Sequence, residues 1–559
     1  MFMQTKSPVN REQRALRAIA RLLGLGLAVS LFGALSCSAP APITEIEYEC
    51  TTSPVASPVV EEGQVCGAGD PELEGMEPSF PTDVCETLVA NRFASDMSPP
   101  SEENLDTARI QNALTACAGR AVKLVADGNN NAFVSGHLNV NGVTLWVDKG
   151  VTLYMSRNPD LFQRTGSCGV LGINDSTACG DFITVSGVKP AIMGDGVIDG
   201  QGGEPLVNRP YSWWQLSYAL REVDGSLGNP TLINLTNGTS GFVLYRITLH
   251  NSAKFHVKIS SIIPPGETCD RRGRGFIVWG VTVLTPSKWT NSQGLVLTPS
   301  FARNTDGIDP GTTAFSRCGL MVCNTISTGD DHIAIKGGHG VYDLTIAHNH
   351  FGTGHGMSIG SETYGLPYMV DGVMHQGIEN IDIRDLTIDA DSRPVGSEAK
   401  SADFNGLRIK SDSSRGGVVR NITYTDICMR DMTNAILIST AYNPLFAGTS
   451  YPEFGDIQFR NVRHVTCKGL HQPVVTLNGF NAALPAGPIT LDNVHVDNMG
   501  PQAVSGEFSN IVLGPGPVNF VPKGVGVTVT DNRVAGSGTP KRCVFPTLPA
   551  PKPPAGWTW

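Results

Sequence analysis

Charged residues, aromatic residues and helical patterns are all scarce in this sequence. Only 16 % of the 559 residues are charged and 7 % are aromatic, whereas glycine occurs 63 times. Beyond about residue 120 no strong helical run interrupts the short apolar segments, which disfavours folds that alternate strands with helices. The composition therefore favours a turn-rich β protein, and the length allows one large domain or roughly three average ones.

An excess of basic residues is also missing, since the formal net charge is −10. This argues against nucleic acid or an anionic membrane as the main partner. It leaves room for a polyanionic substrate that is held in a locally basic cleft. After the N-terminal region no apolar stretch is long enough to cross a bilayer. We expect no nucleic-acid partner, no transmembrane segment in the processed chain, and a monomer.

The N-terminus has the order of a bacterial-type secretory signal. Four arginines, the last of them Arg21, precede an apolar run from Leu22 to Leu35, and small residues follow. We predict a signal peptide over residues 1–36 and a secreted, extracellular protein. The residues that end in Cys37 loosely resemble a lipoprotein box, so a lipid anchor on Cys37 is an alternative.

Thirteen cysteines are present, and an even dozen remains once Cys37 is set aside. CxxC pairs at zinc-site spacing are missing, and an even number in an exported chain favours disulfides over metal or redox chemistry. Close pairs such as Cys168 with Cys179, and Cys318 with Cys323, would close local loops, although the sequence does not fix the connectivity. We expect no metal and no cofactor.

Three regions follow the predicted signal. Residues 37–80 are rich in proline, serine, threonine and glutamate, with little apolar periodicity, which is typical of a linker. We place a single folded domain at 81–548 and a C-terminal tail at 549–559. Near the start of the domain, apolar side chains recur at helical spacing after a candidate cap, Asp106: Ile110, Ala113, Leu114 and Cys117. This pattern predicts a short capping helix.

Short runs rich in valine, isoleucine and threonine then recur to the end of the domain. Five of them align: DGI at 306–308, DHI at 331–333, HGM at 355–357, NGL at 405–407 and NAI at 434–436. The offsets of 25, 24, 50 and 29 residues indicate a solenoid. We therefore predict an all-β fold, a right-handed single-stranded parallel β-helix. Sandwich domains with accidental spacing are the alternative.

The alignment also stacks polar side chains. Equivalent positions on successive coils of a β-helix lie about 5 Å apart, so Asp306, Asp331 and His355 should lie over one another, with Asp330 beside them. Clustered carboxylates repel, and one of them should then hold a proton near neutral pH, as a general acid must. Such acids on either side of a glycosidic bond are the usual machinery of its hydrolysis. Asp309 is assigned to a structural ladder.

The run LRIK adds two cations. Alternate residues of a strand share a face, so Leu407 and Ile409 should point one way and Arg408 and Lys410 the other. Two cations beside three carboxylates are poorly suited to a hydrophobic core. They are well suited to a binding site, because they would bind an anionic sugar. Taken alone, each residue has a plainer interpretation, Arg408 as a solvated strand residue and His355 as a structural histidine.

Four blocks in order, NTDGID, GDDHIAIK, GHGMSIGSE and LRIK, resemble the signature of glycoside hydrolase family 28, the polygalacturonases. The resemblance covers residues 80–530 and includes GVIDGQGG before Trp213 and Trp214. It implies hydrolysis of α-1,4-galacturonosyl linkages in pectin with inversion. The roles carried over by motif are the general acid for Asp330, water activation for Asp306 and Asp331, support of the acid for His355, and substrate binding for Arg408, Lys410 and Tyr442.

The intact Arg-Lys pair favours plain polygalacturonate, a pectic polysaccharide, as the substrate. Insertions at 266–275 and 389–405 would wall one end of the cleft, which favours exo action. The alternatives are a xylogalacturonan or rhamnogalacturonan hydrolase of the same family, a pectate or pectin lyase, and a non-catalytic β-helix protein that binds polysaccharide.

Overall fold

The structure is a computed structural model. It describes residues 50, 66–95, 98–220, 228–264, 267–269, 272–312, 315–365, 367–370, 373–390, 404–442, 448–467 and 472–551. The predicted signal peptide, Cys37, most of the range 37–65 and residues 391–403 of the second insertion lie outside them. No helix among the described residues is long and apolar enough to cross a membrane.

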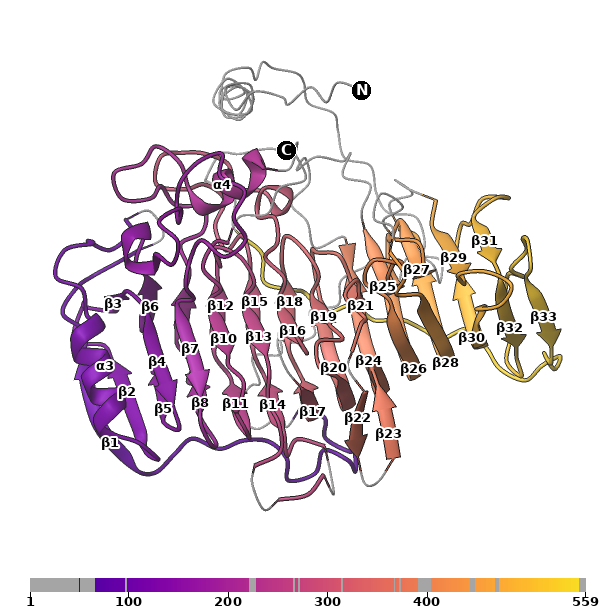
Figure 1. Cartoon of the computed structure of the whole chain (residues 1–559), viewed down its shortest axis with the longest axis horizontal. Coiled ribbons are helices and arrows are strands. Elements are labelled where there is room, and N and C mark those ends of the chain that lie inside the picture. Colours follow the sequence, from indigo (N-terminus) through magenta and orange to yellow (C-terminus); the bar gives the residue numbers. More distant parts are fainter. Residues whose placement is uncertain are drawn as a thin grey trace, which may run out of the picture.

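Parallel strands stack side by side along the whole molecule (Figure 1). One sheet runs in strict chain order and consists of β4 (Leu138–Asn141), β7 (Ile183–Ser186), β10 (Ile233–Leu235), β13 (Val257–Ile259), β16 (Ile308–Pro310), β19 (Ile333–Ile335), β21 (Met357–Gly360), β25 (Asn405–Lys410), β27 (Asn434–Ser439), β29 (Val474–Asn478) and β31 (Val504–Glu507). We call it the site sheet. Each of its strands pairs with the equivalent strand of the next coil, which is the arrangement of a parallel β-helix.

The remaining strands form the other walls of the coils. They are β1 (Val84–Val89), β2 (Ala121–Val125), β3 (Ala132–Ser135), β5 (Thr144–Val147), β6 (Thr152–Met155), β8 (Ala191–Met193), β9 (Val197–Asp199), β11 (Phe242–Tyr245), β12 (Thr248–His250), β14 (Phe276–Trp279), β15 (Thr282–Leu284), β17 (Ser316–Val322), β18 (Thr325–Ser327), β20 (Val341–Phe351), β24 (Ile378–Asp389), β26 (Gly417–Arg430), β28 (Pro452–Val465), β30 (Ala486–Val496), β32 (Ser509–Leu513) and β33 (Thr528–Asp531). A separate antiparallel hairpin joins β22 (Pro367–Val370) to β23 (Val373–Gln376).

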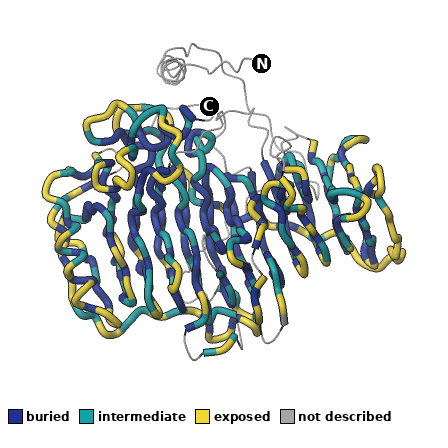
Figure 2. Tube along the Cα trace, viewed as in Figure 1, coloured by how far each residue is buried: buried dark blue, intermediate teal, exposed yellow. Residues whose placement is uncertain are grey.

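The register of the site sheet confirms the alignment of the five repeats. Ile308 pairs with Ile333, Ile333 with Met357, Met357 with Leu407, and Leu407 with Ile436. All five side chains are buried in one continuous apolar core inside the coils. Figure 2 shows this buried interior, with exposure concentrated at the turns. The β-helix prediction is therefore confirmed.

Among the described residues, the α-helices α3 and α4 lie outside the coils. α3 (Thr107–Ala116) buries Ile110, Ala113 and Leu114, as predicted, and contacts β2 and β4 at the N-terminal end of the solenoid. Asp106 stands at the N-cap position but makes no side-chain cap, because its carboxylate accepts from Arg109 Nε (2.7 Å) and Val134 N (2.8 Å). The second helix, α4 (Trp213–Ala219), begins at Ser212 with a capping box.

All twelve cysteines of the described residues form disulfides, which confirms the expectation of disulfides. The pairs are Cys50–Cys467, Cys66–Cys323, Cys85–Cys117, Cys168–Cys179, Cys269–Cys318 and Cys428–Cys543. The local pair Cys168–Cys179 is confirmed, and a bond between Cys318 and Cys323 is wrong. Five residues of extended chain separate those two by about 16 Å, beyond the reach of a disulfide.

Residues Cys66–Phe80 form a segment that we call the N-terminal strap. It lies within the range that composition assigns to a linker, yet it packs across the outside of several coils. Leu73 and Met76 are buried, and the Phe80 ring stacks on Trp146 with centroids 5.0 Å apart. Two apolar anchors are too few to appear as a pattern in the sequence.

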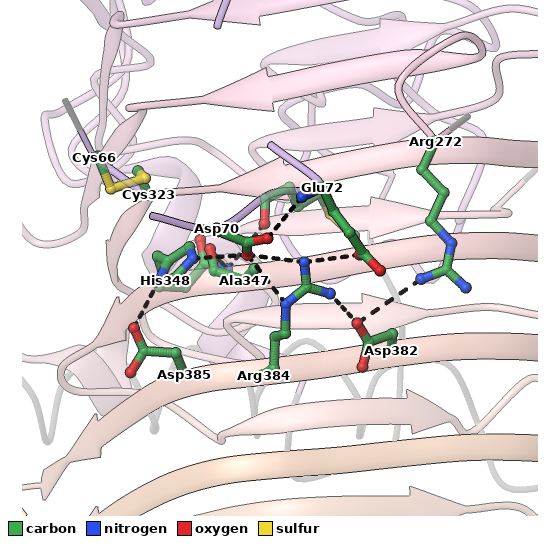
Figure 3. Close-up of polar contacts among 12 residues, drawn as sticks. Cys66, Asp70, Glu72, Arg272, Cys323, Ala347, His348, Asp382, Arg384 and Asp385 are labelled. Carbon is green, nitrogen blue, oxygen red and sulfur yellow. Dashed lines mark hydrogen bonds and ion pairs between the residues drawn. A yellow bond between two sulfur atoms is a disulfide. The ribbon is translucent and has the colours of Figure 1, made fainter. Parts of the chain in front are cut away.

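Ion pairs fasten the strap as well (Figure 3). Asp70 Oδ2 lies 2.9 Å from Arg384 of β24 and 3.2 Å from His348 of β20. His348 Nδ1 also contacts Asp385, at 2.6 Å, and this hydrogen bond is the largest cause that raises the pKa of His348. Together with the bond between Cys66 and Cys323, these contacts tie the strap to the middle coils.

Candidate active site

The predicted site residues come together at the end of the site sheet where β16, β19 and β21 begin. Gly307 N donates to the Asp331 carbonyl at 2.9 Å, and His332 N donates to Gly356 at 3.1 Å. These backbone bonds hold the segments that carry Asp306, Asp331 and His355 on three adjacent coils. The stacking that the repeat predicts is therefore present in the structure.

Asp331 is held by both predicted cations. Its carboxylate accepts hydrogen bonds from the Arg408 guanidinium and from Lys410 Nζ, the latter at 2.9 Å. Arg408 Nε also donates to Ser358 Oγ at 3.1 Å. Burial alone would raise the pKa of Asp331, but Arg408 and Lys410 outweigh it and hold the pKa below its ordinary value. Asp331 is therefore ionised in this arrangement.

Arg408 and Lys410 point away from the core, as the alternation of LRIK predicts. Leu407 and Ile409 lie in the apolar core, while both cations reach Asp331 from the outer face of β25. Only 5 % of each cation is exposed. A solvated strand position is thus excluded for Arg408.

Asp330 turns the other way, toward His355. Its Oδ1 accepts from His355 Nδ1 and from Asp331 N, both at 3.0 Å, and its Oδ2 accepts from Asn304 N at 3.2 Å. Burial raises the pKa of Asp330, but the charge of His355 and its hydrogen bond outweigh burial, so the pKa is lowered overall. Asp330 is also ionised when no substrate is bound.

Asp306 and Asp309 are the acids that favour a proton. Burial, followed by the charges of Asp309 and Asp330, raises the pKa of Asp306 well above its ordinary value. Burial likewise raises the pKa of Asp309 to about 7, against the opposing charge of Lys336. Asp306 Oδ1 and both oxygens of Asp309 have no hydrogen-bond partner among the described residues. The ladder role assigned to Asp309 is therefore wrong, because a ladder carboxylate would bind neighbouring coils.

In the empty site the pKa shifts favour a proton on Asp306 and Asp309 rather than on Asp330, which the family motif suggests as the general acid. The cause is local. Asp330 and Asp331 each have a cationic or donating neighbour, whereas Asp306 and Asp309 are buried beside other acids.

Replacing Asp309 by asparagine should change how stability depends on pH. The folded pKa of about 7 exceeds the ordinary value of 3.8, so the folded state binds more protons than the unfolded state between these values. Stability must then fall as pH rises through this window. We expect Asp309→Asn to match the wild type near pH 4 and to exceed it at pH 8 by about 2–4 kcal/mol.

Urea unfolding at the two pH values, with disulfides intact, measures this difference. The matched control is Asp127→Asn, which changes an exposed acid in a turn. Equal pH slopes for the wild type and Asp309→Asn would show that Asp309 is ionised in the folded protein.

Tyr442 follows β27 at the edge of the cluster and is 41 % exposed. Lys410 Nζ lies 5.1 Å from the centre of its ring. Its backbone N–H donates to Ser411 at 2.8 Å, which fixes the start of its loop. The structure therefore brings Tyr442 to the site, although at its solvent side.

Lys336 is a site residue that the sequence analysis did not identify. It lies in the same row as Gly360 and Lys410 of the following coils and forms an ion pair with Glu362 at 3.4 Å. Burial would lower the pKa of Lys336, but Glu362, Asp309 and Asp306 outweigh it and the pKa is raised. The sequence did contain a signal for Lys336, because IAIK and LRIK both end in a lysine that points out of the core.

Asp330, Asp331 and His355 offer ligand atoms within 4.8 Å of one another, a spacing compatible with a metal ion. The chemistry of the surroundings argues against a resident cation. Arg408 and Lys410 already occupy both oxygens of Asp331, and a divalent ion would have to lie beside two positive charges.

Comparison with known proteins agrees with the motifs. Residues 172–512 match the model of glycosyl hydrolases family 28. A polygalacturonase of Ralstonia nicotianae is 36 % identical over 85 % of this chain and 93 % of its own, and an endo-polygalacturonase of Pectobacterium carotovorum is 37 % identical over 72 % and 90 %. The solved polygalacturonase of Erwinia carotovora superposes with a TM-score of 0.59 at 32 % identity, covering 81 % of this chain and 98 % of that one.

Proposed function

The chain belongs to glycosyl hydrolases family 28, and from this premise we propose that it hydrolyses α-1,4-galacturonosyl linkages of polygalacturonate with inversion. The observation that carries the choice of substrate is the buried pair Arg408 and Lys410 beside the acid cluster. Two buried cations on one strand suit the carboxylate of a uronic acid, since an arginine fork binds a carboxylate through two hydrogen bonds. A neutral sugar would leave both cations paired with Asp331 alone.

The mechanism that we infer starts with an exchange of partners. The sugar carboxylate takes over Arg408 and Lys410, so Asp331 loses the contacts that hold its charge in place. Asp331 and Asp306 then orient a water molecule, for which the unpartnered Oδ1 of Asp306 is suited. One of these acids removes a proton from the water as it attacks the anomeric carbon.

The general acid is proposed to be Asp330. Because the substrate brings negative charge and excludes solvent, its arrival should raise the pKa of Asp330 from the lowered value of the empty site. His355, which contacts Oδ1 at 3.0 Å, is the neighbour through which Asp330 is oriented and its proton kept available. The protonated Asp330 then donates to the leaving glycosidic oxygen.

The test uses purified protein on polygalacturonate with a chelator present. Reducing ends and the ultraviolet absorbance of unsaturated products are followed together. We expect reducing ends to rise without new absorbance, because hydrolysis creates no double bond and the site has no need of a metal. Absorbance that rises with the cuts would identify a lyase. No rise in either reducing ends or absorbance would point to another pectic backbone or to a binding protein.

The same digest tests the mode of attack. Exo action rests on the insertion 389–405, whose residues 391–403 lie outside the described residues, and on the insertion 266–275. If it is correct, monomer or dimer appears from the start while the viscosity of the substrate falls slowly. Early products of intermediate length would instead establish endo action, the mode named for the Pectobacterium relative.

We further propose that the protein is secreted and acts as a monomer. Six disulfides among the described residues support an oxidising compartment. Both cations and all the acids come from one chain, so the site needs no second copy. The predicted signal peptide and the alternative lipid anchor on Cys37 remain predictions, since they fall outside the described residues.

A further inference from the structure

A second group of cations lies on the coil that precedes the acid cluster. Lys254 and Lys258 flank the ring of Phe255, with Nζ atoms 5.2 and 6.0 Å from its centre. Arg303 lies nearby, and burial together with Lys258 and Arg303 lowers the pKa of Lys254 to about 8. Asp306 and Asp181 oppose this shift, and Lys258 lies beside Asp309 in the register of β13 and β16. Like charges held together in this way cost stability, which an anionic ligand would relieve.

The register of the site sheet places this group in line with the site. Lys258 pairs with Asp309, and the same outward row continues through Ala334 and Ser358 to Arg408. Four strand spacings, about 19 Å, separate the two ends of the row. One monosaccharide cannot reach both ends, so Lys258 and Arg408 would contact different sugars of one chain. Ala334 and Ser358, in the middle of the row, have small side chains that are fully buried.

Phe255 occupies the position on its coil that Asp306 occupies on the next coil. It lies two residues before Val257, as Asp306 lies two residues before Ile308, and Val257 pairs with Ile308. The aromatic ring is thus one coil away from the acid that is proposed to hold the water. A partly exposed aromatic face at this distance is suited to the apolar face of a sugar ring.

Helix α4 gives both cation-bearing loops a common support through Trp214. The Trp214 indole N–H donates to the Ser252 carbonyl at 2.8 Å, just before Lys254. The same indole packs in a buried cluster with Phe301 and Ala302, just before Arg303. Ser252 Oγ in turn donates to the Phe255 carbonyl at 2.9 Å. The two loops are therefore fixed before any ligand arrives.

We propose that Lys254, Phe255 and Lys258, with Arg303 beside them, form a second subsite for an anionic sugar, on the side of the cleaved bond opposite to Arg408 and Lys410. The ligand class is a uronic acid, whose carboxylate lies between the ammonium groups while its ring covers Phe255. This inference rests on the proposed function and deepens it. Because both sides of the acid cluster then require a charge, an unesterified galacturonan is favoured over a backbone that alternates with neutral sugars.

The experiment compares Lys254→Gln/Lys258→Gln with the wild type on polygalacturonate and on its methyl ester. We expect KM for polygalacturonate to rise about tenfold for each lost charge contact, and the preference for the unesterified polymer to shrink in proportion. Lys258→Arg, which keeps the charge, should retain most of the affinity. The matched control Lys149→Gln/Lys523→Gln removes two exposed lysines elsewhere and should change neither value.

Stability separates a binding role from a structural one. Because glutamine keeps a polar side chain at both positions, the melting temperature should stay near that of the matched control, whereas loss of a structural contact would lower it. A KM within twofold of the control, with the preference intact, overturns the subsite. Calorimetric binding of polygalacturonate in the Asp330→Asn background repeats the comparison without turnover. A protein that binds through these lysines but never cuts would overturn the proposed hydrolysis and leave the subsite supported.

Discussion

The Asp330→Asn variant should fold and bind polygalacturonate normally yet turn it over about 10²–10⁴-fold more slowly, the usual worth of a positioned general acid. The single amide oxygen of asparagine can still accept from Asp331 N, as Oδ1 does in the wild type, whereas the contact of Asn304 N with Oδ2 is lost. What it cannot do is transfer a proton to the leaving oxygen. The loss should therefore appear in kcat and leave KM nearly unchanged.

Steady-state kinetics and a thermal unfolding curve for each variant decide the matter. The control Asp127→Asn makes the same chemical change at an exposed turn and should retain wild-type kcat. If Asp330→Asn retains more than half of the wild-type kcat, the proton donor is another residue. Asp306, whose pKa is raised in the empty site, would then be the first candidate.

The second large effect is expected from Arg408→Gln, which should lower kcat/KM about 10²–10³-fold and also destabilise the fold by about 3 kcal/mol. The loss of activity comes from the missing contact with the sugar carboxylate. The loss of stability comes from Asp331, which keeps Lys410 but loses the guanidinium that contributes most to its lowered pKa.

A second substitution separates these two effects. In Arg408→Gln/Asp331→Asn the uncompensated carboxylate is gone, so urea unfolding should recover most of the stability while kcat/KM stays low. Arg408→Lys should recover little activity, because an ammonium lacks the fork that also reaches Ser358 Oγ. Because Asp331 is itself proposed to activate water, the double variant tests stability alone, and a full recovery of activity in Arg408→Lys would show that the guanidinium fork is not needed to bind the substrate.

The site sheet could be predicted from the sequence because the apolar residues of its repeats fix how neighbouring strands align. DGI, DHI, HGM, NGL and NAI each end in an apolar residue that must enter the core, and a slip of one residue would expose it. That constraint alone aligned Asp306, Asp331 and His355, and it put Arg408 and Lys410 on the outer face.

The distribution of protons could not be predicted in this way. It depends on which acid has a donor within about 3 Å, and the motif gives no such distances. Asp309 shows the difference, since its spacing suits a ladder but its oxygens meet no partner in the described part of the chain. Lys254 and Lys258 were not identified as site residues because the acids near them, Asp306 and Asp309, lie one coil further along the chain.

The N-terminal strap was hidden for a related reason, since Asp70 and Arg384 lie 314 residues apart. Its consequence concerns the order of assembly. A solenoid whose coils touch only their neighbours can be completed coil by coil as the chain is made. In this chain the disulfide of Cys66 cannot form before Cys323 has been synthesised. The disulfide of Cys50 needs Cys467, which is 417 residues away. The N-terminal residues Cys50 and Cys66 are therefore bonded late, although they are synthesised before their partners.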